Sequence, residues 1–169
     1  GITHVCINEG YSGINLDDVA PVYAVVDLSN ASDHVVKFVT TADSFTPQTC
    51  HSMFYGFTNL RTITGLEYLE TANETSMKNM FRDCYSLTSL DLSHFDTHNV
   101  TNFGDMFHNC RAITSLDLST FVRSSNANMS NMFDNCLYLS TLSLGAGMDF
   151  SYNVDSTIFT RVGYAGGDV

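Results

Sequence analysis

The stretch MFRDCYSLTSLDLSHFDTHNVTN, residues 80–102, decides the fold, because most of it returns as MFHNCRAITSLDLSTF at residues 106–121. Met-Phe pairs occur four times along the chain, and successive pairs are 27, 26 and 26 residues apart. The pairs are Met53-Phe54, Met80-Phe81, Met106-Phe107 and Met132-Phe133. Four turns in one register indicate an array of repeats, in which each unit buries its apolar side against its neighbours.

Other residues keep the same register as the Met-Phe pairs and should form the shared core. One column holds three cysteines, and the following columns hold leucine, isoleucine or phenylalanine. These residues are Cys84, Cys110 and Cys136, then Leu60, Leu87, Ile113 and Leu139, then Ile63, Leu90, Leu116 and Leu142, then Leu92, Leu118 and Leu144, then Phe95 and Phe121. Because cysteine without a disulfide is often buried, we expect the three aligned cysteines to stay reduced inside the core.

Each repeat is expected to contain one short strand and one short helical turn. The runs LTSLDLS (87–93) and ITSLDLS (113–119) end in alternating apolar and polar residues, the pattern of a half-buried strand. The runs NMFRDC and DMFHNC cluster Met, Phe and Cys as a helical turn would. The predicted fold class is therefore an α/β repeat solenoid of about four coils.

The repeat reaches neither end of the chain. Residues 1–48 contain the strand-like runs PVYAVVDLS and HVVKFVTT, separated by the turn-forming NASD, so we expect a β-rich N-terminal cap or accessory domain there. We assign residues 49–147 to the repeat solenoid and residues 148–169 to a C-terminal cap or arm.

The pattern LxxLDLSxFDTxNVTNxxxMFxxCxxL resembles the BspA-like bacterial surface-protein repeat, a leucine-rich-repeat-like unit of about 26 residues. The resemblance is strongest over residues 80–121 and extends over about residues 50–147. It weakens at GLEYLETANETS in the first repeat and at FVRSSNANMSN after the third. The resemblance implies a leucine-rich-repeat-like solenoid, display on a bacterial or protist surface, and adhesion or protein binding. It supplies no catalytic residues.

Charge and composition exclude several classes of partner. Seven Lys and Arg residues against 18 Asp and Glu give a net charge of −11, so phosphates and anionic lipids would repel the chain. We therefore expect no nucleic-acid binding. No apolar run approaches the roughly 18 residues that span a bilayer, so we expect no membrane insertion. A charged fraction of 15%, with abundant Ser, Thr and Asn, favours an extracellular or cell-surface protein.

The sequence contains no recognisable catalytic or metal-binding motif. GxSxG, HExxH, CxxC and glycine-rich phosphate loops are all absent. We expect no enzyme activity, no catalytic residues, no cofactor and no metal site. In an oxidising compartment Cys6 and Cys50 could form a disulfide that ties the N-terminal region to the first repeat.

The strand positions that point away from the core form a strip of small hydroxyls with two aspartates. This candidate binding face consists of Thr62, Thr64, Ser89, Asp91, Ser93, Ser115, Asp117, Ser119, Thr141 and Ser143. One interpretation is an adhesive face, or a weak Ca²⁺ or glycan contact. The other, which the usual exposure of polar residues favours, is a solvated surface that prevents aggregation.

Two functions remain open at this point. The first is adhesin-like recognition of a host protein or glycan through a solenoid face. The second is a structural subunit of an extracellular filament, surface layer or virion appendage, joined to copies of itself through its terminal segments.

Overall fold

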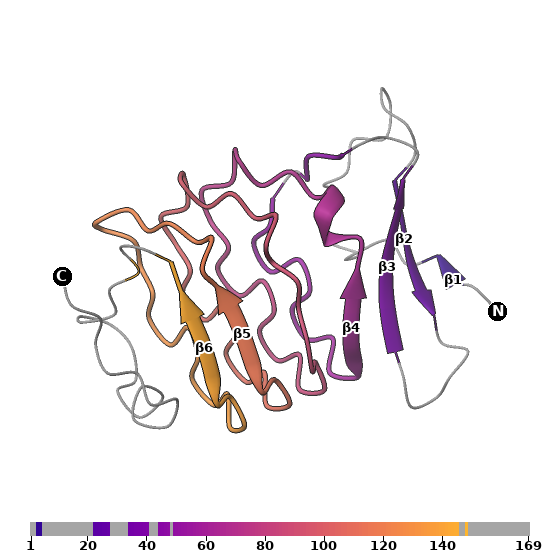
Figure 1. The fold of residues 1–169 in the computed structure, drawn as a ribbon. Helices are drawn as coiled ribbons and strands as arrows, with labels where there is room; N and C mark the ends of the chain where they lie inside the picture. Colours follow the sequence, from indigo (N-terminus) through magenta and orange to yellow (C-terminus); the bar gives the residue numbers. More distant parts are fainter. Residues whose placement is uncertain are drawn as a thin grey trace.

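The computed structural model describes residues 3–4, 22–27, 34–40, 44–47, 49–145 and 148. Its first part is a four-stranded sheet with strand order β1-β2-β3-β4 (Figure 1). The strands are β1 (Thr3–His4), β2 (Val22–Asp27), β3 (His34–Thr40) and β4 (Leu60–Thr64). Neighbours pair antiparallel except β3 and β4, which are parallel. The two strands predicted in the N-terminal region are confirmed, and β4 joins them to the first repeat.

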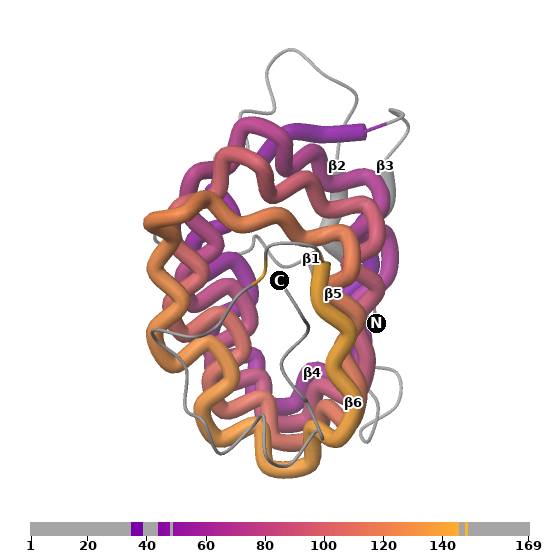
Figure 2. The backbone as a smooth tube through the Cα atoms, turned by 60° about the vertical axis from the view of Figure 1, so that its left-hand side comes forward, coloured from indigo at the N-terminus to yellow at the C-terminus, as the bar shows by residue number. Residues whose placement is uncertain are grey.

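The remaining regular elements are few. A 3₁₀ helix, η1 (Leu66–Tyr68), follows β4, and a separate two-stranded parallel sheet contains β5 (Ser115–Leu118) and β6 (Thr141–Leu144). Between residues 49 and 145 the chain passes through successive loops that lie side by side around a common interior (Figures 1 and 2). Within the described residues no helix is long and apolar enough to cross a membrane.

The predicted fold class is wrong. The described residues contain no α-helix, and their regular structure is limited to the short 3₁₀ helix and two small sheets. The run LTSLDLS at residues 87–93 forms no strand, whereas the matching segment of the first repeat, β4, belongs to the N-terminal sheet. The chain therefore does not form the expected leucine-rich-repeat-like α/β solenoid with a strand and a helical turn in each coil.

Left-handed backbone conformations explain why the Met-Phe segments are not helical. Asn79 and Asp83 flank the Met80-Phe81 pair with φ angles of 59° and 63°. The other repeats have positive φ at the same two positions, at Ser52, Gly56, Asp105, Asn109, Asn131 and Asn135. An α-helix needs a φ near −63° at every residue, so these positions interrupt it. Asn, Asp and Gly are the residues that tolerate the left-handed region best.

The backbone amides of these segments alternate between two kinds of partner. Residues 80, 82 and 84 donate to the carbonyl three residues earlier. The Phe81 N–H instead donates to the Met106 carbonyl, and the Asp83 N–H donates to the His108 carbonyl, both at 2.9 Å. The same alternation joins the third repeat to the fourth. Consecutive repeats are thus connected by backbone hydrogen bonds where no regular strand exists.

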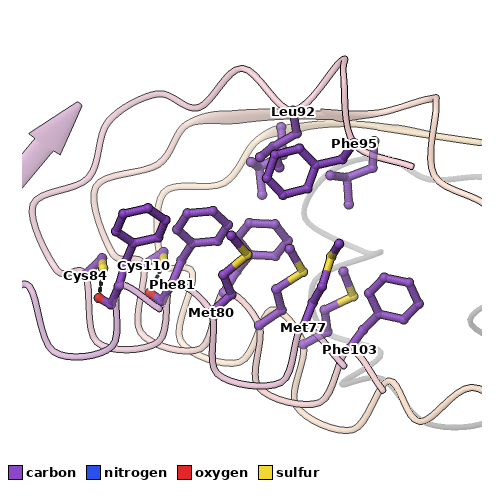
Figure 3. Packing of buried hydrophobic residues seen from close by; sticks show 14 of the residues in the cluster. Met77, Met80, Phe81, Cys84, Leu92, Phe95, Phe103 and Cys110 are labelled. Carbon is purple, nitrogen blue, oxygen red and sulfur yellow. Dashed lines mark hydrogen bonds between the residues drawn. The ribbon is translucent and has the colours of Figure 1, made fainter. Parts of the chain in front are cut away.

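Most of the aligned apolar residues are buried inside these loops, as the register predicted (Figure 3), whereas Leu90, Leu142 and Leu144 are only partly buried. The rings of Phe54, Phe81, Phe107 and Phe133 stack nearly parallel, with centroids 5.4 to 5.7 Å apart. Such stacked aromatic contacts add to the hydrophobic gain of burying the rings. The Met-Phe columns therefore form the centre of the core.

The cysteine column is buried and reduced, as expected. The thiols of Cys84, Cys110 and Cys136 each donate to a phenylalanine carbonyl of the preceding repeat at 3.1 Å. Burial raises the pKa of the Cys84 thiol to about 12, so this thiol stays protonated at neutral pH. Protonated, buried thiols are poor nucleophiles, and the column is structural.

Two buried threonines connect repeats elsewhere in the loops. The Thr71 hydroxyl donates to the Asp96 carbonyl at 3.0 Å and accepts the Asp96 N–H at 2.8 Å. Thr97 makes the same two bonds with Val122 at 2.9 and 2.8 Å. Each hydroxyl hydrogen-bonds to both backbone groups of one residue in the next repeat, and these bonds offset the desolvation cost of burying the polar groups.

Asn135 offers a test of the left-handed positions, because it is exposed and has a φ of 59°. Asn135→Val should lower the free energy of unfolding by about 1–2 kcal/mol, since a β-branched residue is strained in that region. Asn135→Gly should change it little. Urea denaturation followed by circular dichroism measures both variants, and equal stabilities would contradict the left-handed geometry.

The core assignment predicts a second stability difference. Phe107 is fully buried, so Phe107→Ala should cost about 3–5 kcal/mol of unfolding free energy. Leu90 is only partly buried, so Leu90→Ala should cost clearly less. A Phe107→Ala protein with the urea midpoint of the unaltered chain would refute the phenylalanine column.

Candidate functional site

The strip predicted as a binding face lies on the surface of the described structure. The register of β5 and β6 places Ser115 beside Thr141 and Asp117 beside Ser143. Thr62 is half-buried, and the other nine predicted residues are exposed: Thr64, Ser89, Asp91, Ser93, Ser115, Asp117, Ser119, Thr141 and Ser143. The exposure of these nine side chains agrees with the predicted alternation, and the role of the strip in binding stays a prediction.

The two aspartates of the strip are engaged by their own neighbours. Asp91 Oδ1 accepts the Ser93 hydroxyl at 2.7 Å and the Ser93 N–H at 3.1 Å. Asp117 Oδ1 accepts the Ser119 N–H at 2.9 Å. The Ser93 hydroxyl, then its N–H, lower the pKa of Asp91, and Ser119 lowers the pKa of Asp117 in the same order. These hydrogen bonds hold the turn that follows each strand position. They also leave fewer oxygen lone pairs on the two carboxylates free to bind a ligand than an unbonded carboxylate would have.

The other predicted features have less structural support. No three His, Cys, Asp or Glu side chains in the described part of the chain come together as metal ligands. Cys6 lies outside the described residues. Cys50 is buried, and its N–H donates to the Glu74 carboxylate at 3.0 Å. The disulfide between these two cysteines stays untested.

Large exposed side chains gather at a different place, the turn that leads from each Met-Phe segment towards the strand position. Tyr85, Arg111 and Leu137 occupy the same position in the second, third and fourth repeats, and Tyr138 follows directly. The exposed fractions of Tyr85, Leu137 and Tyr138 are 38%, 49% and 68%. The turns before β5 and β6 lie at the lower side of Figure 1. We call these four residues the tyrosine–arginine edge.

Arg111 is pre-positioned within this edge. Its guanidinium carbon lies 4.8 Å from the centroid of the Tyr85 ring, within the range of a cation–π contact. Among the described residues Arg111 makes no ion pair, so its N–H groups remain available to a partner. Sequence reasoning missed this edge, although its signal was present: the position directly after the cysteine column holds a large residue in three consecutive repeats.

A second missed feature is a row of ionisable side chains that crosses the repeats, which we call the ion-pair ladder after its Arg82–Asp105 pair. Arg82 Nη1 lies 3.1 Å from Asp105 Oδ1 in the next repeat. His108 Nδ1 lies 3.7 Å from Asp105 Oδ1 and 3.4 Å from Asp134 Oδ2 in the repeat after. Arg82, His108 and Asp134 share one register position. Their side chains and that of Asp105 are at least 65% buried. The ladder joins repeats beside the backbone hydrogen bonds.

Comparison with known proteins gives one match. The protein family described as "Mycoplasma protein of unknown function, DUF285" matches residues 26–143, which is more than half of the chain. No curated protein and no solved structure matches this chain.

The lowered pKa of Asp91, one of the two aspartates of the strip, can be tested by substitution. Ser93→Ala removes the largest cause of the low pKa of Asp91, so that pKa should rise towards the ordinary value, while the remaining N–H bond keeps part of the effect. A low folded-state pKa stabilises the protein above the unfolded value, and this contribution is lost as the pH falls. NMR titration of the carboxyl carbon measures the shift. Ser89→Ala is the control, and an equal shift in both variants would contradict the Ser93 contact.

Proposed function

The chain belongs to the family described as "Mycoplasma protein of unknown function, DUF285", and for this member we propose a non-enzymatic, adhesin-like recognition module displayed at a cell surface. The proposal includes its assignment to the BspA-like surface repeat proteins, which its repeats resemble. Its partner is a protein or glycan on another surface. The tyrosine–arginine edge is the contact, and the hydroxyl strip is the polar surface beside it.

The observation that carries this proposal is the type of residue exposed at the edge. Tyrosine and arginine are the residues, together with tryptophan, that most often dominate the binding energy of protein interfaces. Tyr138 exposes 68% of its surface directly beside Leu137, which exposes 49%, and contiguous exposed apolar side chains are typical of interaction surfaces. Arg111 is already held over Tyr85, so it loses little conformational freedom on binding.

The backbone around the edge is well held, which supports recognition by a preformed surface. The Cys110 N–H donates to the Phe107 carbonyl at 3.0 Å just before Arg111. After the edge, the Ser140 N–H donates to the Thr114 carbonyl of the preceding repeat at 2.9 Å. Hydrogen bonds on both sides fix the turns before any partner arrives, so the entropic cost of binding is low.

The strip beside the edge suits the rim of an interface better than its centre. Its residues are small, and its two carboxylates are already hydrogen-bonded to serines. Rim positions contribute little energy but exclude water from the central contacts. The net charge of −11 supports a partner other than nucleic acid or anionic lipid.

The test is binding of the purified chain to a glycan array and to a panel of extracellular and cell-surface proteins. Arg111→Ala and Tyr138→Ala should each weaken binding to the identified partner by about tenfold or more, as hot-spot truncations do. The double variant Ser115→Ala/Thr141→Ala, on the strip, should keep most of the affinity.

Two outcomes would contradict the proposal. If the strip variant lost binding while the edge variants kept it, the contact would be the strip. If no protein or glycan bound and light scattering showed oligomers that grow with concentration, the chain would be a structural subunit instead.

A further inference from the structure

We propose that the tyrosine–arginine edge recognises a glycan that ends in an acidic sugar, and that Arg111 binds the carboxylate of this sugar. This choice of partner rests on the proposed function and narrows it to one chemical class. The distribution of charge over the turns of the edge and the contacts of Arg111 support it.

The turns that form the edge contain no acidic residue, although the chain is strongly acidic. They occupy the same register in the four repeats, at residues 58–61, 85–88, 111–114 and 137–140. These turns hold two arginines, Arg61 and Arg111, whereas the whole chain has a net charge of −11. Exposed charges more than about 8 Å away are largely screened at physiological ionic strength. A small anion at the edge therefore interacts mainly with the two arginines.

The second turn connects these two arginines. The Thr88 N–H and hydroxyl donate to the Arg61 carbonyl at 3.0 and 3.2 Å. At the start of the same turn, the Tyr85 ring centroid lies 4.8 Å from the guanidinium carbon of Arg111. Both arginines are exposed, and neither forms an ion pair within the part of the chain that the structure describes. Two cations without acidic partners therefore flank one turn.

The carboxylates nearest to this turn in the sequence are engaged elsewhere. Before the turn, Asp83 Oδ1 accepts the Asn109 Nδ2–H at 2.6 Å. After the turn, Asp91 Oδ1 accepts the Ser93 hydroxyl at 2.7 Å. Neither carboxylate forms an ion pair with Arg61 or Arg111, so a carboxylate from a ligand has no competitor of this kind to displace.

The chemistry of arginine favours a carboxylate as the bound anion. A guanidinium offers two parallel N–H groups whose spacing matches the two oxygens of a carboxylate. The contact with Tyr85 restrains the Arg111 side chain before the ligand arrives, so forming both bonds costs less conformational entropy.

The other exposed groups of the edge favour a sugar as the carrier of that carboxylate. Tyr138 and Leu137 are exposed side by side, and the C–H groups on one face of a sugar ring can pack on such an apolar surface. Thr88, Thr114 and Ser140 share one exposed register position, where their hydroxyl oxygens can accept hydrogen bonds from sugar hydroxyls.

An extended peptide fits these turns less well than a sugar. A peptide that binds by strand addition needs free backbone groups. The Thr88 and Ser140 amides are already bonded to the preceding repeat, at 3.0 and 2.9 Å.

A single terminal acidic sugar also fits the surface better than a long polyanion does. The strip continues directly from the turns, since Ser89 follows Thr88, and it contains Asp91 and Asp117. These two exposed carboxylates would repel the further charges of a polyanion that extended over the strip.

Calorimetric titration of the unaltered chain tests the carboxylate. The probes are oligosaccharides that end in glucuronic acid or in a sialic acid, each compared with its counterpart in which the carboxyl group is reduced to an alcohol. At least one acidic probe should bind about tenfold or more tightly than its reduced counterpart, because hydrogen bonds to a charged group are the stronger ones.

Three variants assign the preference to Arg111. Arg111→Gln should abolish the preference for the acidic probe. Arg111→Lys should lower it several-fold, because lysine keeps the charge but lacks the two parallel N–H groups. Lys37→Gln is the matched control: it removes one exposed positive charge from β3, outside the edge, and should leave the preference unchanged. Circular dichroism checks that each variant is folded.

The possible results separate this inference from the proposed function. Equal binding of the acidic and reduced probes, or an acid preference that survives in Arg111→Gln, would overturn the acidic sugar and leave recognition of a neutral glycan standing. A protein partner that requires Arg111, with no sugar bound, would overturn the acidic sugar and support the proposed function. Binding of neither sugars nor proteins would contradict both.

Discussion

The backbone hydrogen bonds that run from one repeat to the next are the interaction on which the rest of the structure depends. They connect residues 25 to 27 positions apart, for example Phe54 to Met80 and Phe81 to Met106. Each buried amide left without a partner would lower the stability of the fold, so these bonds fix the register of each repeat. Once that register is fixed, equivalent side chains stack on one another. The phenylalanine, cysteine and charged rows are all consequences of this spacing.

The buried columns could be predicted from the sequence, whereas the local conformation could not. Burial depends on which positions are repeatedly apolar, and the register shows this directly. The prediction of a helical turn failed because Met80, Phe81 and Cys84 have helical spacing, whereas Asn79 before the pair and Asp83 after it adopt left-handed angles. Asn, Asp, Ser or Gly stands at these two positions in every repeat, and that regularity was the available warning. The strand prediction failed at residues 87–93 although the similar run at 113–119 forms β5, because a strand needs a partner in register as well as a suitable sequence.

The same distinction applies to the candidate sites. The strip could be predicted because alternate residues of a strand point to opposite sides, and nine of its ten members are exposed. The edge and the ladder depend on contacts between repeats, such as Arg111 over Tyr85 and Arg82 with Asp105. The sequence register shows which residues occupy the same or neighbouring positions of successive repeats. It does not show which of these side chains come into contact, because that depends on how each turn directs its side chains.

A change of residue at an exposed register position alters the surface of one repeat and leaves the stacking of the repeats unchanged. The Met-Phe pair is kept in all four repeats, and its rings and backbone hold the register. The position after the cysteine column instead changes from Tyr85 to Arg111 to Leu137, and the ladder position changes from Arg82 to His108 to Asp134. Because the inter-repeat bonds come from the backbone, neither change breaks them. A surface built in this way can combine an aromatic ring, a cation and a titratable group within three repeats, and each of them is held by the same invariant core.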